Sequence, residues 1–129
     1  MASPRLAKLR RQLLRWTCRL AALVALIYLC DYLLDAHMRI TKAPSCEWYA
    51  VPRPDGDFYS ARYCWLSKDT QLLHLYDEGG QLIAERTYPY SNVPQFIWGA
   101  DFLQYDTWPE GSFIALPPSL IDRLRAKLP

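Results

Sequence analysis

The residue of this chain best suited to acid–base chemistry is His74, the single histidine after residue 45. Its chemistry would be that of a general base in a hydrolase, oriented by the carboxylate of Asp77 or Glu85. Such a site also needs a nucleophile within reach, and no motif places a serine or cysteine beside His74. The alternative is a cross-strand polar pair between His74 and Glu85 on one face of a sheet. We predict this pair, and we expect the chain to be no enzyme and to have no catalytic residues.

Metal chemistry finds little support in the pattern of acidic residues and cysteines. Nearly all carboxylates after residue 45 fall in predicted turns, where Asp bonds to the local backbone. Asp55-Gly-Asp57 could form half of a calcium loop, but the regular spacing of such loops is missing. The chain has no Cys-x-x-Cys pair, which argues against zinc and thioredoxin-type sites. We therefore expect no metal, no cofactor and no small-molecule ligand.

The cysteine pair Cys46 and Cys64 indicates a disulfide. Pro52-Arg-Pro-Asp-Gly56 between them is a strong turn sequence. If the turn is tight around Pro54-Asp55, Cys46 falls opposite Tyr63 or Cys64 in a hairpin. A bridge there would close a loop of about 19 residues and contribute roughly 3 kcal/mol to the free energy of unfolding. It would also require an oxidising compartment.

The element that must position the residues after 45 is an N-terminal membrane helix. Residues 16–35 are mostly apolar, and roughly 17 to 20 such residues can span a bilayer. Arg19 and Asp31 lie inside this span but near its ends, where Arg can reach the headgroups and Asp is less costly than at the centre. Asp31 could instead pair with a basic group on another membrane helix.

The flanking charges predict the orientation of this helix. Six basic residues and no acidic one precede the uninterrupted apolar run at residues 20–30 (Arg5, Lys8, Arg10, Arg11, Arg15 and Arg19). An excess of Lys and Arg keeps a flank in the cytoplasm. A cleaved signal peptide is the main rival, but the residues after Cys30 lack a small-x-small cleavage site. A basic helix lying on the membrane surface is a weaker rival, because residues 20–29 have no polar face.

The domain organisation follows from this anchor. We predict a basic cytoplasmic tail over residues 1–15, the anchor over 16–35, a juxtamembrane linker over 36–45 and an extracytoplasmic domain over 46–129. From residue 36 onward there are nine basic and eleven acidic residues, a formal charge of −2 against +2 for the whole chain. The basic character belongs to the membrane flank, which argues against nucleic-acid binding.

The exported domain is predicted to be mainly β. Short strands are expected at residues 46–51, 57–66, 71–77, 81–88, 96–98, 102–105 and 112–116. Gly79-Gly80 predicts a two-residue hairpin turn in which Tyr76 pairs with Ile83, and His74 with Glu85. Ser119, followed three residues later by Asp122, predicts the start of an amphipathic C-terminal helix. The fold class is therefore an antiparallel meander of five to seven strands between an N-terminal membrane helix and a C-terminal helix that covers part of a face or an edge.

Aromatic residues are too numerous to be buried together in a domain of about 90 residues. Tyr59, Tyr63 and Trp65, which share one face of the strand at 57–66, are expected in the core. Exposed aromatic side chains near acidic residues indicate a protein-binding patch. The candidates for this patch are Trp48, Tyr90, Trp98, Tyr105 and Trp108.

Several stretches resemble known families. The Pro54-Asp-Gly56, Leu75-Tyr-Asp77 and Trp98-Gly-Ala-Asp101 motifs resemble β-propeller blades of the TolB type, and residues 76–82 resemble one YD repeat of Rhs toxins. Neither function carries over, because both architectures need many repeats. In layout the chain is similar to small, uncharacterised proteobacterial inner-membrane proteins with one helix and a periplasmic β domain. That resemblance implies a bacterial inner membrane, a periplasmic domain and, for some such proteins, an immunity or accessory role beside a secretion system.

We therefore expect a membrane-anchored module that binds another envelope or secreted protein. Two alternatives remain. One is a structural subunit of an envelope complex that acts through its membrane helix and Asp31. The other is an envelope hydrolase that uses His74 with Asp77 or Glu85.

Overall fold

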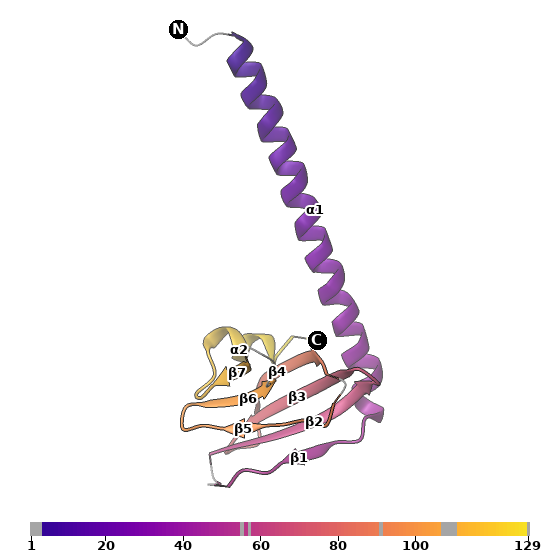
Figure 1. Ribbon diagram of the computed structural model, residues 1–129, viewed down its shortest axis with the longest axis vertical. Coiled ribbons are helices and arrows are strands. Elements are labelled where there is room, and N and C mark those ends of the chain that lie inside the picture. Colours follow the sequence, from indigo (N-terminus) through magenta and orange to yellow (C-terminus); the bar gives the residue numbers. More distant parts are fainter. Residues whose placement is uncertain (1–3, 55, 57, 91, 107–110, 129) are drawn as a thin grey trace. The chain divides into compact units, whose positions relative to one another are not determined.

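The computed structural model describes residues 4–54, 56, 58–90, 92–106 and 111–128, with side chains from Lys8 onward. It divides into two compact units, Met1–Ala36 and His37–Pro129, which are described separately. Helix α1 (Pro4–Lys42) begins in the first unit and ends in the second. The second unit contains seven strands and the short helix α2 (Figure 1).

Helix α1 is long because its sequence is rich in Leu, Ala and Arg, which favour helix, and has no Gly or internal Pro. Its 39 residues correspond to about 58 Å, nearly twice the thickness of a bilayer core. The side chains from Lys8 to Asp31 are all exposed. The chain thus has one N-terminal helix long and apolar enough to cross a membrane, properties that a signal sequence shares.

The stretch predicted as a linker is ordered. Helix α1 continues to Lys42, and a 3-10 turn, η1 (Ala43–Ser45), follows it. Arg39 is 8% exposed in the second unit, so this last part of α1 belongs to the β domain. Regular helix therefore leads directly into the first strand region.

The first sheet contains β1 (Tyr49–Val51), β2 (Tyr59–Ser67), β3 (Thr70–Asp77) and β4 (Leu82–Pro89) in that order. All three pairings are antiparallel. The β2–β3 connection is tight, with Ser67 opposite Thr70. Strand β1 is shorter than the predicted segment at 46–51.

The β3–β4 hairpin confirms one of the two predicted pairs and corrects the other. His74 pairs with Glu85 as expected, but Tyr76 pairs with Leu82 instead of Ile83, because a bulge follows Leu75. Gly80 adopts a φ of 77°, which favours glycine at this turn position. The carboxylate of Asp77 accepts a hydrogen bond from the backbone N–H of Gln81 at 2.8 Å, which further closes the turn.

The predicted disulfide is confirmed, although the predicted hairpin register is wrong. Cys46 and Cys64 are bonded, with their Cα atoms 6.0 Å apart. Tyr49 pairs with Tyr63, which does not fit a tight turn at Pro54-Asp55. The connection between β1 and β2 runs from Pro52 to Phe58 and is longer than such a turn. Cys46 precedes β1 and can reach Cys64 in either register.

The second sheet contains β5 (Ile97–Trp98), β6 (Phe102–Asp106) and β7 (Ser112–Ala115), joined in sequence order. The two sheets pack through their inner faces. One continuous core holds Leu73 and Leu75 of β3, Ala84 of β4, Leu103 of β6 and Ile114 of β7, all with 0% exposure. Because strand side chains alternate, the residues between these positions point away from the core. The fold is the predicted antiparallel β class, as two meanders of four and three strands.

Helix α2 (Leu120–Arg125) begins as predicted. The Ser119 hydroxyl accepts a hydrogen bond from the backbone N–H of Asp122, and the Asp122 carboxylate accepts one from the backbone N–H of Ser119. The helix lies against β4, where the Arg86 guanidinium donates to the Asp122 carboxylate. Its apolar side chains do not cover the sheet, since Leu120 and Ile121 are 74% and 75% exposed.

Candidate functional site

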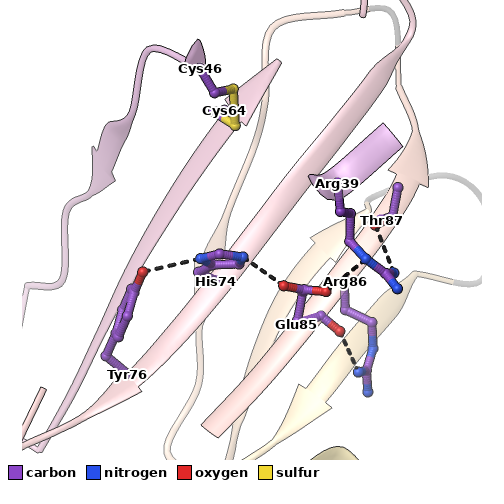
Figure 2. A network of polar contacts seen from close by, with 8 residues as sticks. All are labelled: Arg39, Cys46, Cys64, His74, Tyr76, Glu85, Arg86 and Thr87. Atoms are coloured by element: carbon purple, nitrogen blue, oxygen red, sulfur yellow. Dashed lines mark hydrogen bonds and ion pairs between the residues drawn. A yellow bond between two sulfur atoms is a disulfide. The ribbon is translucent and has the colours of Figure 1, made fainter. Parts of the chain in front are cut away.

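A polar network lies on the outer face of the first sheet, opposite the core (Figure 2). Alternation along β3 sends Leu73 and Leu75 inward and His74 and Tyr76 outward. Glu85 reaches the same face from β4, because it is the cross-strand partner of His74. The last turns of α1 add Arg39 to this group. Side chains from three elements thus meet on one face.

His74 uses both of its ring nitrogens within the network. Nε2 lies 2.8 Å from Glu85 Oε2, and Nδ1 lies 3.1 Å from the Tyr76 hydroxyl oxygen. In a neutral His74 these contacts assign the proton to Nε2, which donates to the carboxylate, while the Tyr76 O–H donates to Nδ1. The predicted cross-strand pair with Glu85 is confirmed. Asp77 follows Tyr76 in β3 and therefore points to the other face of the sheet.

The Glu85 carboxylate binds both His74 and Arg39. Its Oε1 lies 3.1 Å from Arg39 Nε, and the side chains of Arg39 and Glu85 are 8% and 14% exposed. Arg39 Nη1 lies 3.5 Å from the Thr87 hydroxyl oxygen. Such a shielded charge pair is far more costly to break on one side than an exposed pair. The network therefore ties the end of α1 to the middle of β4.

Trp48 packs against this network. The Trp48 ring lies over the His74 ring, with centroids 4.6 Å apart and a 36° angle between the planes. Trp48 also packs on the small apolar cluster formed by Cys64, Leu66 and Leu72.

Burial raises the pKa of the Tyr76 hydroxyl above its ordinary value, with smaller opposed effects of nearby charges. Tyr76 therefore stays protonated at neutral pH and can remain a donor.

The arrangement is suited to holding a structure together and poorly suited to acid–base catalysis. A general base needs a lone pair directed at a substrate proton, and both His74 nitrogens already face protein partners. Across the part of the chain that the structure describes, no group of three or more His, Cys, Asp or Glu side chains is arranged to hold a metal ion. Asp55 and Asp57, the possible half of a calcium loop, lie outside the described residues.

Two of the aromatic residues predicted for a binding patch pack within the domain. Tyr105 is only 8% exposed, with its ring 4.8 Å from that of Tyr88 in the core, so it cannot belong to an exposed patch. Tyr90 is half-buried against the same core, and its backbone N–H donates to the Asp69 carbonyl at 2.9 Å. Packing thus accounts for both residues.

Trp98 is half-buried and held at the junction between the sheets. Its Nε1 donates to the Pro52 carbonyl at 3.0 Å, and the Arg53 guanidinium lies 4.8 Å from its ring centroid. This geometry is a cation–π contact. Trp108 lies outside the described residues. Of the predicted set, Trp48, Tyr90 and Trp98 keep partial exposure, and all three have structural contacts.

Arg19 and Asp31, the charged residues of the predicted span, are both exposed on α1. The Arg19 guanidinium lies 5.8 Å from the Trp16 ring centroid, one turn toward the N-terminus. A Trp–Arg pair of this kind suits the headgroup region of a membrane. The Asp31 carboxylate projects from the other end of the apolar stretch.

An exposed apolar surface was missed at the sequence level. It is the outer face of the second sheet, which we call the β6 face and define by Ile97, Phe102, Gln104 and Phe113. Ile97 and Phe113 are 49% and 62% exposed, and Gln104 lies between them as the partner of both. Phe102, Gln104 and Phe113 also line a shallow cavity of about 300 Å³.

Local sequence shapes the β6 face. The Phe102 and Phe113 rings meet edge to face with centroids 6.3 Å apart. A Cβ atom at Gly99 would lie 2.3 Å from the Phe102 ring, so glycine makes room for this ring. The sequence signal for the β6 face is the alternation along β6. Phe102, Gln104 and Asp106 share the side away from Leu103, and Phe102 is the apolar residue among them.

Comparisons of the chain with models of protein families, with curated proteins and with solved structures found no match. The functional argument therefore depends on the surfaces and contacts described above.

Proposed function

We propose that this chain is a membrane-anchored, extracytoplasmic module that binds another protein. In this proposal residues 16–35 of α1 stay in the membrane uncleaved, with the N-terminus in the cytoplasm, as the basic flank favours. The Cys46–Cys64 disulfide supports an oxidising compartment such as a bacterial periplasm. The partner is an envelope or secreted protein.

The observation that carries the proposal is the β6 face. Exposed apolar groups gather there around a shallow cavity, with Ile97 and Phe113 about half exposed or more. Contiguous apolar surface with a polar group at its centre is typical of protein interfaces. Gln104 supplies that polar group: its Nε2 donates to the Asp106 carbonyl at 3.3 Å, and its Oε1 can accept a hydrogen bond from a partner's backbone N–H. The β6 face replaces the aromatic set expected from the sequence as the proposed contact region.

The biological role proposed for this binding module follows the resemblance of its layout to small proteobacterial inner-membrane proteins. An immunity protein against a toxin delivered to the periplasm would need a tether and a rigid binding face. An accessory subunit of a secretion system would need the same two features. Identification of the partner distinguishes these roles, because a toxin and an assembly component differ in their own activity.

The test compares two phenylalanines of equal size and similar exposure on different sheets. Phe113 on the β6 face is 62% exposed, and Phe58 beside the first sheet is 66% exposed. The full-length protein in detergent, carrying either Phe113→Ser or Phe58→Ser, is used to capture binders from envelope and secreted fractions of the source organism. We expect one stoichiometric partner with the unmodified chain and Phe58→Ser, and its loss with Phe113→Ser. Equal capture by all three proteins would contradict a role of the β6 face.

A second candidate is a structural subunit that acts through its membrane helix. The observation in its favour is the exposed Asp31, since a carboxylate within a membrane segment is costly unless it finds a partner or a headgroup. Exchange of residues 16–35 for an unrelated membrane helix separates the two candidates. Lost function after this exchange would favour the structural subunit, and retained function would favour the β6 face.

The hydrolase alternative loses support from the geometry of His74. We infer that His74 holds the outer face of the first sheet together and that the chain is not an enzyme. Any activity found for the protein should then survive His74→Gln in a variant that remains folded. Loss of activity in a folded His74→Gln protein would restore the hydrolase alternative.

A further inference from the structure

Helix α2 turns its apolar side away from the domain. Leu120 and Ile121 are 74% and 75% exposed, and Leu124 and Leu128 are each 56% exposed. Their neighbours Asp122 and Ala126 are half-buried and face the sheet. A short helix normally buries its apolar stripe against the core, because this burial is the main source of its stability. Here the capping box and the Arg86–Asp122 ion pair hold the helix in the opposite orientation.

Basic residues flank the apolar side of this segment. At about 100° per residue, Leu120, Ile121 and Leu124 of α2 fall within roughly one third of the helical circumference, and Leu128 follows the helix after a turn. Arg125 lies at one margin of this sector and Arg123 at the other, and Lys127 lies in the turn that follows α2. Arg123 and Lys127 also line a shallow cavity beside Asp77, whose single carboxylate leaves an excess of positive charge. Long basic side chains at the margins of an apolar stripe are typical of helices that lie in a membrane interface.

The same strand that holds α2 also holds the end of the N-terminal helix. Arg86 of β4 binds Asp122 of α2, and the adjacent residue Glu85 binds Arg39 of α1. Both contacts lie within the second unit. Because adjacent side chains of a strand point to opposite faces, Glu85 holds the end of α1 on the outer face of β4 and Arg86 holds α2 on the other face.

We propose that the segment from Ser119 to Leu128 docks on the anionic lipid surface beside the anchor. The occupant is the bilayer interface: acyl chains receive Leu120, Ile121, Leu124 and Leu128, while phosphate headgroups bind the flanking basic side chains. A segment this short would bind weakly alone, but the anchor supplies a high effective concentration of lipid. Docking gives the domain a second contact with the membrane and fixes its orientation. The inference rests on the anchor in the proposed function, but not on the protein partner.

The test measures the depth of a spin label in the full-length chain in nanodiscs. Cys18 and Cys30, the free cysteines, are replaced by Ser, and the Cys46–Cys64 bridge is kept. One nitroxide is placed by Ile121→Cys. Collision rates with oxygen, which concentrates in lipid, and with a water-soluble nickel complex are then compared in discs of phosphatidylcholine with and without phosphatidylglycerol. Insertion of the chain into the discs tests the anchor separately from the position of α2.

The matched control places the label by Val93→Cys, because Val93 is 81% exposed and lies outside α2. With phosphatidylglycerol present, we expect oxygen collisions to dominate at position 121 and nickel collisions at position 93. Replacing Arg123, Arg125 and Lys127 with Gln should shift position 121 toward nickel collisions. Equal nickel access at positions 121 and 93 in both lipids would overturn the proposal. Spin–spin broadening at position 121 in discs that hold two copies would overturn it in favour of a dimer contact.

Discussion

Removal of the Glu85 carboxylate is the most direct test of the network on the outer face of the first sheet. Glu85 accepts from His74 Nε2 at 2.8 Å and pairs with Arg39 Nε at 3.1 Å, and the three side chains are at most 14% exposed. Glu85→Ala therefore removes the charge that compensates a shielded arginine. Loss of one partner from such a buried pair costs about 3–5 kcal/mol. This is a large share of the roughly 5–15 kcal/mol that stabilises a typical domain.

Two further substitutions divide this cost. Glu85→Gln keeps an oxygen acceptor for His74 but removes the negative charge, so we expect it to lose about half as much stability as Glu85→Ala. Arg39→Met combined with Glu85→Ala removes both charges, and its cost should be clearly smaller than the sum of the single costs. Glu78→Ala is the control, because Glu78 is exposed in the hairpin turn and should change stability by about 0.5 kcal/mol or less.

The assay is urea unfolding of the full-length protein in detergent micelles, followed by tryptophan fluorescence. The ring of Trp48 lies on His74, so unfolding of this face changes its environment. The reasoning is refuted if Glu85→Ala costs less than about 1 kcal/mol, the value of a solvent-exposed ion pair. Additive costs of the Arg39 and Glu85 substitutions would show that the two side chains are not coupled.

Three other predictions concern the same domain. Replacing Cys46 and Cys64 with Ser should lower the free energy of unfolding by roughly 3 kcal/mol, measured as a lower urea midpoint. Burial of Asp122 opposes its ionisation, but the hydrogen bond from Arg86 lowers the pKa of the Asp122 carboxyl. The ionised carboxylate therefore stabilises the fold at neutral pH, and this stabilisation is lost as the pH falls below about 4. Asp122→Asn should weaken the acid dependence of the urea midpoint. Burial raises the pKa of the Tyr88 hydroxyl. The contribution of this hydroxyl to the free energy of unfolding is therefore complete below about pH 10 and is lost at higher pH. Tyr88→Phe should make the loss of stability at alkaline pH less steep.

Each of these three predictions has a contrary outcome. Serine at the free cysteines Cys18 and Cys30 should leave the urea midpoint unchanged, and an equal loss there would mean that the bridge has no special role. An Asp122→Asn protein with an unaltered acid profile would contradict the Arg86 contact. An alkaline profile that Tyr88→Phe leaves as steep as before would assign the loss to other groups.

Local chemistry made the main elements predictable. The hairpin with Gly79-Gly80, the His74–Glu85 pair and the capping box at Ser119 depend on nearby residues alone, and all three are observed. The Cys46–Cys64 bridge was also predictable, since only two cysteines follow the anchor. The register of Tyr76 was not, because a bulge arises from packing on both faces of the strand.

The exposure of individual aromatic residues was less predictable, because it depends on how the sheets pack. Tyr105 has the aromatic character of an interface residue but lies in the core, whereas Trp98 contacts Arg53 and keeps partial exposure. Phe113 was not singled out, because a single phenylalanine in a short strand points inward or outward depending on the partner sheet. The exposed apolar side of α2 likewise depends on a tertiary contact, because the Arg86–Asp122 ion pair holds the helix together with its capping box.

The sequence by itself therefore determined the apolar N-terminal helix, the antiparallel β class, the disulfide and the helix cap, because each depends on composition, short spacing or backbone chemistry. The tertiary structure alone decided which faces are covered. It brought Arg39 to Glu85 across 46 positions of the chain, left the β6 face open and turned the apolar side of α2 outward. The physical reason is that alternation specifies two faces of each strand or helix, whereas only the packing of distant elements selects the face that is buried.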